Sequence, residues 1–299
     1  MKVKKHHLLK NNSATTVSGV RPLGTLFVFF FVSCFPAYAG SLQETTTPKT
    51  FADWCLNKSK LSVETLNTIN ALLQVAKTTD CNQASKFLST LTALSLYNNQ
   101  IVDLKPLSTL TNLTSLSLTS NQIAGIKPLS NLTNLTTLWL DNNQITDLRP
   151  LSGLTNLTKV WLDNNQITDL RPLSGLTNLT KVWLYDNQIS NLSPLSGLTK
   201  LTELTLTKNQ IANLSPLSGL TNLTTLWLDN NQIADLKPLS NLTNLRELYL
   251  ENNQIADLKP LSNLTNLREL YLGNNPSLTD KTCPVKPAST CKFVLLNDQ

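Results

Sequence analysis

Between residues 91 and 276 the sequence repeats itself every 22 residues, and this period constrains the fold more than any other feature. One unit runs from Leu135 to Asn156 and carries the pattern L-x-x-L-x-L-x-x-N-x-I. A marker asparagine recurs in phase at Asn99, Asn121, Asn143, Asn165, Asn187, Asn209, Asn231, Asn253 and Asn275. A repeat this short buries its apolar side only by stacking against its neighbours. The sequence therefore predicts a solenoid, in which each unit contacts the units before and after it.

The first half of each unit shows the alternation of a short strand. Leu138 and Leu140 flank Trp139, which predicts that the leucines point inward. Trp139 and Asp141 are then expected to point outward. Parallel strands lie about 4.8 Å apart, so nine of them would form a sheet about 40 Å long.

The second half of each unit must bring the chain back to the next strand. Asn143 stands where the backbone leaves the strand, and we expect its amide to pair with buried main-chain groups, giving an asparagine ladder. A proline recurs with the same period, as at Pro150, and its fixed φ suits a tight return. The period leaves no room for a long helix, so short 3₁₀ turns are predicted there.

Residues 50–90 and 277–299 flank the repeats, at the two places where a solenoid needs caps. The first segment is predicted to be helical, with helix starts at Thr50, Ser62 and Asp80, because these side chains accept hydrogen bonds from a first helical turn. We therefore expect a helical N-terminal cap, the repeats over 91–276, and a short C-terminal cap.

The cysteines also lie outside the repeats. Cys34 belongs to the N-terminal leader, and the other four lie in the caps, at Cys55, Cys81, Cys283 and Cys291. Four thiols in an exported chain indicate two disulfides. Of the three possible pairings we expect one bond within each cap, since a bond between the caps would span the whole solenoid. No zinc site is expected, because its ligands would have to converge from opposite ends of the chain.

The first 39 residues have the three parts of a secretory signal peptide. A basic stretch precedes an apolar run at 23–35, and small residues end at Ala39. The run is too short to span a membrane, which takes about 20 residues. We expect cleavage after Ala39, a linker at 40–49, a secreted or periplasmic protein, and no membrane span in the mature chain. A retained anchor and a lipid anchor at Cys34 are the alternatives.

The net charge of +6 comes almost entirely from this leader. The chain has 25 Lys and Arg against 19 Asp and Glu, and the leader holds five basic residues and no acidic one. Without the leader 20 basic residues remain against 19 acidic ones, a net charge of +1. The basic excess therefore does not indicate a nucleic-acid-binding protein.

The repeat and both caps resemble known proteins. The unit L-x-x-L-x-L-x-x-N-Q-I-x-D-L-x-P-L-S-x-L-T-N is similar to the internalin-type, SDS22-like class of bacterial leucine-rich repeats. The segments F-A-D-W-C at 51–55 and T-C-P-V-K-P at 282–287 resemble the caps of exported cyanobacterial repeat proteins. The resemblance covers residues 50–293. It implies an α/β solenoid: a right-handed leucine-rich-repeat horseshoe of about nine repeats, with a parallel concave sheet, a helical N-terminal cap and short convex 3₁₀ turns.

The resemblance further implies that partners bind on the concave sheet. The sequence contains no immunoglobulin-like domain, LPxTG sorting signal or GW module, so the host-invasion role of internalins is not implied. The outward strand positions supply the candidate ligand-binding residues, which are Trp139, Asp141, Lys159, Trp161, Asp163, Lys181, Trp183, Tyr185, Trp227, Asp229, Tyr249, Glu251 and Tyr271. A row of exposed aromatic side chains typically marks a binding surface. Packing that only stabilises the sheet is the alternative interpretation.

The charges of this face favour a neutral or cationic partner. Its outward positions carry seven acidic residues and two basic ones, a local charge near −5, and such a face repels the phosphates of nucleic acid. Asp141 and Asp163 should lie about one strand apart. We expect neither catalysis nor calcium binding from them, because an open sheet offers no pocket to shift a pKa and no loop supplies enough oxygens.

The sequence thus predicts a binding protein rather than an enzyme. No histidine follows residue 7, which excludes Ser-His-Asp and Cys-His sites from the mature chain. We expect an exported monomer without cofactor or metal that recognises a protein or peptide. The alternatives are recognition of a glycan by the same face and a structural role in the envelope or matrix without a discrete ligand.

Overall fold

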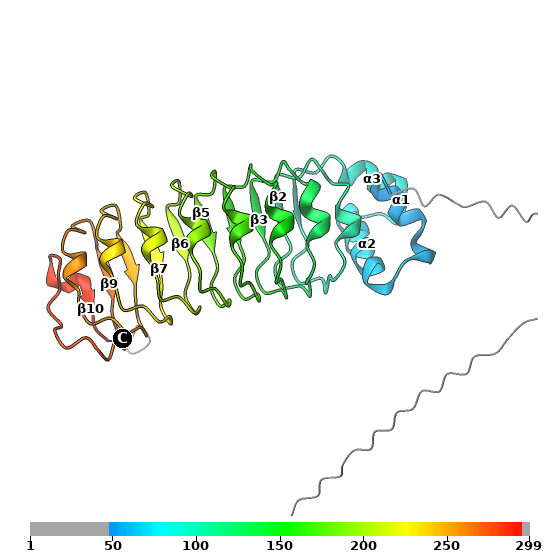
Figure 1. Cartoon of the computed structure of the whole chain (residues 1–299). Helices are drawn as coiled ribbons and strands as arrows, with labels where there is room; N and C mark the ends of the chain where they lie inside the picture. The colour runs from blue at the N-terminus through cyan, green and yellow to red at the C-terminus, as the bar shows by residue number, and fades with distance from the viewer. Residues whose placement is uncertain (1–47, 295–299) are drawn as a thin grey trace, which may run out of the picture. The chain divides into compact units, whose positions relative to one another are not determined.

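The computed structural model describes residues 48–294. The predicted signal peptide, its cleavage position after Ala39 and Cys34 lie outside the described residues, as does most of the predicted linker. Figure 1 shows the described part as turns of chain stacked in sequence order, from the blue helices to the red C-terminal segment. Among these residues no helix is long and apolar enough to cross a membrane.

A single parallel sheet runs through the repeats, with its strands in sequence order. The strands are β1 (Ala93–Ser95), β2 (Ser115–Ser117), β3 (Thr137–Trp139), β4 (Lys159–Trp161), β5 (Lys181–Trp183), β6 (Glu203–Thr205), β7 (Thr225–Trp227), β8 (Glu247–Tyr249), β9 (Glu269–Tyr271) and β10 (Cys291–Lys292). From β1 to β9, each strand pairs with the next so that partner residues are 22 apart in sequence. The last repeat strand, β9, pairs with β10 of the C-terminal cap. Equivalent positions of successive repeats therefore lie side by side.

Short 3₁₀ helices lie on the return side of the repeats, as predicted. They are η2 (Lys105–Leu107), η3 (Lys127–Asn131), η4 (Arg149–Leu151), η5 (Arg171–Leu173), η6 (Ser193–Leu195), η7 (Ser215–Leu217), η8 (Lys237–Leu239) and η9 (Lys259–Leu261). Each has the recurring proline in its first turn, as Pro150 in η4. Proline is favoured there because its fixed φ suits the helix and the missing N–H is not needed.

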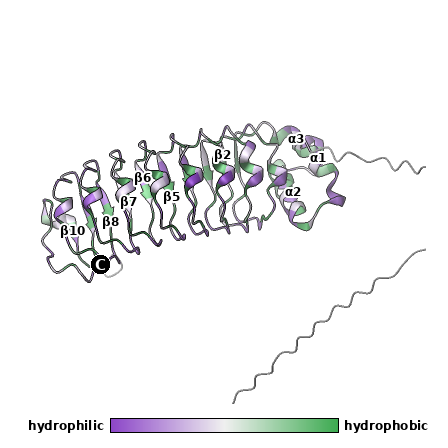
Figure 2. Cartoon of the chain, in the orientation of Figure 1, coloured by the Kyte–Doolittle hydropathy of each residue, from purple (hydrophilic) through white to green (hydrophobic). Residues whose placement is uncertain are grey.

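The core is a column of leucines and isoleucines between the sheet and the 3₁₀ helices. In one repeat Leu138, Leu140, Ile145, Leu148 and Leu151 are all buried. The same positions are buried in the following repeats, so the core is continuous along the stack. Figure 2 shows hydrophobic and hydrophilic residues alternating along the repeats.

The marker asparagines form the predicted ladder. The Asn165 Oδ1 accepts a hydrogen bond from the Ile145 N–H at 2.9 Å, and its Nδ2 donates to the carbonyls of Leu140 and Leu162 at 3.0 and 3.1 Å. The same bonds recur at Asn121, Asn143, Asn187, Asn209, Asn231, Asn253 and Asn275. The residue before each marker asparagine has φ between 51 and 60°, a left-handed conformation that asparagine tolerates better than most residues.

The N-terminal cap contains α1 (Phe51–Leu56), η1 (Lys58–Lys60), α2 (Val63–Ala76) and α3 (Cys81–Leu88). The helices begin where the sequence predicts, because the side chains of Thr50, Ser62 and Asp80 accept hydrogen bonds from the first turns. Helix α2 is tied to the first repeat by Thr68, whose hydroxyl donates to the Asp103 carbonyl at 2.6 Å. The apolar end of the stack is thereby covered.

Each cap holds its own disulfide, as the architecture predicts. Cys55 is bonded to Cys81, and Cys283 is bonded to Cys291. The C-terminal cap also contributes η10 (Ala288–Thr290) and β10. Strand β10 was not predicted, because residues 277–294 do not follow the repeat pattern, and it pairs with β9 as a tenth strand.

Candidate functional site

The outward side chains of β1 to β9 form the face that we call the concave face. In register, Trp139 lies beside Trp161, and Trp161 lies beside Trp183. Their rings stack, with centroids 4.7 and 4.3 Å apart and planes inclined by 17° and 5°. We call these three indoles the first stack.

A second stack follows further along the sheet. Trp227 stacks on Tyr249 at 5.5 Å, and Tyr249 stacks on Tyr271 at 4.7 Å. Thr205 lies in register between Trp183 and Trp227, so the aromatic column is interrupted there by one strand. The structure thus brings the six predicted aromatic residues of this column together as two groups of three.

Stacking changes what these rings offer to a partner. Trp161 and Tyr249 each have an aromatic ring on both faces, and all six side chains are only partly exposed. Their edges and the outer faces of the end rings are the parts that remain for contact. Tyr185 lies one column away, with the Lys208 ammonium 5.5 Å from its ring centroid.

The aspartates predicted to face outward are in large part buried. Asp141 is 8% exposed, and its Oδ2 accepts a hydrogen bond from the Thr119 hydroxyl at 3.1 Å. The Asp163 Oδ1 accepts from the Tyr185 N–H at 2.7 Å. These carboxyls are therefore engaged with their own sheet, contrary to the expectation of open acidic side chains.

Asp229 repeats this arrangement four repeats after Asp141. Its Oδ1 accepts from the Glu251 N–H at 2.9 Å, and its Oδ2 accepts from the Thr207 hydroxyl at 3.3 Å. Burial raises the pKa of Asp229 to about 6. Burial, with the nearby Asp141, raises the pKa of Asp163 to about 7, and burial also raises the pKa of Asp141.

The predicted absence of pKa shifts on this face is therefore wrong. The sheet is open, but these carboxyl groups are largely buried within it, which disfavours their charged form. The local charge near −5 is also too negative, since Asp163 is partly protonated at neutral pH.

The remaining charged candidates differ in environment. Lys159 is exposed, whereas the Lys181 ammonium pairs with the Glu203 carboxylate on the next strand. Near the second stack, the hydroxyls of Tyr249 and Tyr271 both donate to Glu269 Oε2, at 3.4 and 3.3 Å. Sequence reasoning left Glu203 and Glu269 out of the candidate site, although both occupy the outward strand position that also holds Lys159 and Lys181.

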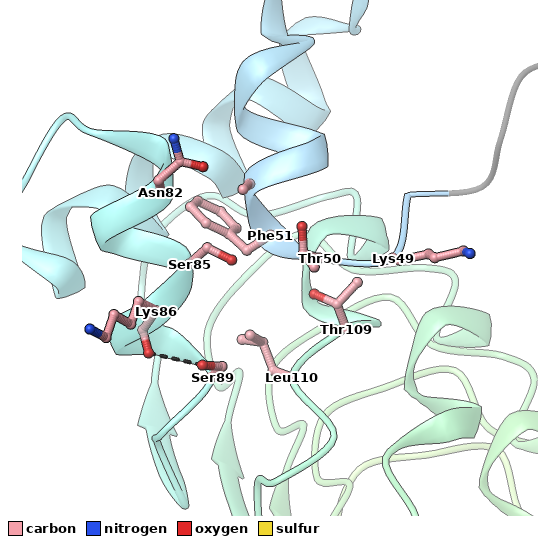
Figure 3. A pocket seen from close by; sticks show the side chains of 10 residues that line it. Lys49, Thr50, Phe51, Asn82, Ser85, Lys86, Ser89, Thr109 and Leu110 are labelled. Atoms are coloured by element: carbon pink, nitrogen blue, oxygen red, sulfur yellow. Dashed lines mark hydrogen bonds between the residues drawn. The ribbon is translucent and has the colours of Figure 1, made fainter.

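A cavity of about 510 Å³ opens on the concave face next to the first stack. It is lined by Ala93, Leu94, Ser95, Ser115, Ser117 and Trp139. A separate cavity of about 470 Å³ lies where the N-terminal cap meets the first repeats, between α1, α3 and Leu110, and contains none of the predicted site residues (Figure 3). Within residues 48–294 no group of three or more potential ligands could hold a metal ion.

Comparison with known proteins agrees with the repeat and with its geometry. The family model for leucine-rich repeats (two copies) matches residues 89–241 and 243–282 in overlapping segments. Internalin C2 of Listeria monocytogenes is similar in structure, with a TM-score of 0.63 and 40% identity over 66% of this chain and 88% of that chain. The search of curated proteins found no match.

Two further solved structures share the fold. A leucine-rich-repeat protein of Leptospira interrogans has a TM-score of 0.57 and 27% identity, over 69% of this chain and 61% of its own. The ectodomain of the Arabidopsis thaliana receptor kinase GASSHO1/SCHENGEN3, in complex with Casparian strip integrity factor 2, has a TM-score of 0.55 and 25% identity, over 62% of this chain and 24% of its own. The chain belongs to the leucine-rich-repeat family and is structurally similar to the internalins of Listeria.

Proposed function

We propose that this chain is an exported, non-enzymatic binding protein that recognises a protein or peptide partner on its concave face. The observation that carries the proposal is the pair of aromatic stacks, which place six aromatic side chains in one column on the outer side of the sheet. Large aromatic side chains dominate the binding energy of protein interfaces.

The surroundings of the stacks support a peptide-like partner. Lys159 and Lys181 stand two positions before Trp161 and Trp183 on the same strands, and Glu247 and Glu269 stand two positions before Tyr249 and Tyr271. Charges of both signs therefore border the apolar rings, as at the rim of a protein interface.

The comparisons and the disulfides are consistent with this proposal. The Arabidopsis ectodomain was solved in complex with a partner, which shows that a leucine-rich-repeat relative binds one. The two disulfides favour an oxidising compartment, as export would provide. The predicted residues Asp141, Asp163 and Asp229 fit the proposal less well than the rings, because the sheet itself uses their carboxyls.

A peptide library displayed on phage tests the proposal directly. We expect selection on the wild-type protein to enrich peptides that lose binding to the Trp161→Ala/Trp183→Ala variant. The matched control is Asp147→Ala/Arg149→Ala, which removes an exposed ion pair on the return side and should keep binding. Peptides that bind both double variants equally would refute the concave site. A library without any enriched peptide would favour a structural component without a discrete ligand.

A further inference from the structure

The first stack ends at Trp139, and one face of that ring is left without an aromatic neighbour. Its other face stacks on Trp161 at 4.7 Å. On the open side, the residue in register with Trp139 is Ser117, and Ser95 follows on the next strand. The column thus changes from indoles to small hydroxyl side chains at this point.

This change in side-chain size creates the cavity of about 510 Å³. Its lining combines the Trp139 ring with alanine, leucine and serine residues of β1 and β2. None of the six lining residues carries a charge. A charged ligand would therefore lose water without gaining a counter-charge inside the cavity.

The serine hydroxyls of the cavity are available for a ligand. Within the described part of the chain, the hydroxyls of Ser95, Ser115 and Ser117 make no hydrogen bond. In five repeats the return-side serine behaves differently: its hydroxyl donates to the carbonyl three residues earlier, at Ser108, Ser152, Ser174, Ser196 and Ser218. On the return side, serine hydroxyls thus stabilise the turn, whereas the cavity serines make no such bond.

We infer that this cavity binds a neutral hexose ring of an oligosaccharide. The C–H face of a pyranose can lie on the open face of Trp139, and its hydroxyls can pair with the serine hydroxyls, which both donate and accept. An aromatic side chain would also stack on the indole, but it would cover the serine hydroxyls without pairing them. A hexose satisfies both halves of the cavity.

The other end of the first stack lacks these properties. The Lys181 ammonium lies 5.9 Å from the Trp183 ring centroid and pairs with Glu203 on the next strand. A charged pair thus borders that face. The residue in register with Trp183 is the single threonine Thr205, and Trp227 occupies the column on the next strand, so the gap there is one strand wide. At the Trp139 end, two successive strands carry serines beside the open indole face.

This inference goes beyond peptide recognition by the stacks and does not depend on it. The test is a titration of the full chain, with both disulfides formed, with cellohexaose. Binding is measured by calorimetry and by saturation-transfer NMR. The Ser117→Trp variant adds one more indole to the stack and fills the cavity. We expect it to weaken cellohexaose binding at least about tenfold. The matched control is Thr205→Trp, which places an indole at the equivalent position of a distant strand and should leave binding within about twofold.

A second variant tests the hydroxyls without filling the cavity. Ser95→Ala/Ser117→Ala keeps the indole face and is expected to weaken cellohexaose binding about threefold or more. The following results would overturn the inference. They are equal binding by wild type and Ser117→Trp, equal or tighter binding of the charged polygalacturonate, and absence of saturation transfer to cellohexaose. Displacement of cellohexaose by the peptide acetyl-Gly-Phe-Gly-amide at lower concentration would also overturn it, because the cavity would then prefer an aromatic side chain.

Discussion

The Asp163 carboxylate accepts a hydrogen bond from the backbone N–H of Tyr185, one repeat further along the sheet, at 2.7 Å. Asp229 holds the N–H of Glu251 in the same way at 2.9 Å. These aspartates lie where the strands end, so each ties its strand to the next beside the asparagine ladder. Their position in the outward column is therefore compatible with a structural role. That role requires the carboxyl groups to be buried, which disfavours their charged form.

The burial of the Asp163 carboxyl group should make the stability of the fold depend on pH between pH 5 and 8. The pKa of Asp163 is raised to about 7 in the folded chain, above its usual value of 3.8, so the folded state binds this proton more tightly than the unfolded state. The resulting stabilisation is complete below about pH 4 and is lost as the pH rises through about 7. We expect the urea midpoint to fall from pH 5 to pH 8, and to fall less in Asp163→Asn.

The control for this experiment is an aspartate whose pKa moves in the opposite direction. Hydrogen bonds from Arg149 lower the pKa of Asp147, so its contribution is lost only as the pH falls below the usual range of a carboxyl. Asp147→Asn should therefore keep the wild-type slope between pH 5 and 8. A wild-type midpoint that rises over this range would show that Asp163 is ionised in the folded chain.

The asparagine ladder gives a second prediction. Asn165 is 8% exposed and satisfies one N–H and two carbonyl groups of the turn at 2.9 to 3.1 Å. Asn165→Ala leaves the buried Ile145 N–H without a partner and removes one of the two amide donors to each carbonyl, which also accept from Asn143 and Asn187. We expect a loss of about 1–3 kcal/mol in the free energy of unfolding. Urea denaturation measures it.

Asn156 is the matched control for the ladder. It is exposed, and its Nδ2 makes a single hydrogen bond to the Thr133 carbonyl at 2.9 Å. Asn156→Ala should cost less than about 1 kcal/mol, because water can replace its bond. If the two alanine variants had the same midpoint, burial of the ladder would not contribute to stability.

The fold could be predicted closely because one period decides it. The strict recurrence of Leu138, Asn143 and Pro150 fixes the strand, the ladder and the 3₁₀ return, and stacking then follows for every repeat. Strand β10 was missed because the C-terminal cap has no such recurrence. The pairing of Cys55 and Cys283 with partners in their own caps followed from topology.

The candidate site was predictable only in part. Strand alternation places Trp161 and Asp163 on the same face, and both are found there. Alternation says nothing of how far a side chain is buried by its neighbours. The stacking of Trp161 on both sides and the burial of Asp141 depend on how neighbouring repeats pack, which the pattern does not contain.

The two disulfides should contribute unequally to stability. Cys55 and Cys81 are 26 residues apart, whereas Cys283 and Cys291 are 8 apart. Because a longer closed loop restricts the unfolded chain more, chain entropy gives about 3.6 kcal/mol for the first bond and about 2.6 kcal/mol for the second. We expect the Cys55→Ala/Cys81→Ala variant to have the lower urea midpoint. A lower midpoint for the C-terminal double variant would show that sealing the last repeat outweighs loop length.

The first stack predicts a difference between its middle and end rings. Trp161 stacks on two indoles at 4.7 and 4.3 Å, whereas Trp139 stacks on one. A stacked aromatic pair contributes about 0.5–1.5 kcal/mol beyond the area it buries. Trp161→Ala should therefore destabilise the chain by about 0.5–1.5 kcal/mol more than Trp139→Ala, as measured by urea denaturation with unchanged slope.

Tyr97 supplies the control for this comparison, because it lies on the same face, is 59% exposed and has no stacking partner within the described residues. Tyr97→Ala should change the free energy of unfolding by less than about 0.5 kcal/mol. Equal costs for Trp139→Ala and Trp161→Ala would mean that the rings contribute through burial alone. Stacking itself would then add nothing to the stability of the sheet, which strengthens the case that the rings are aligned for a partner.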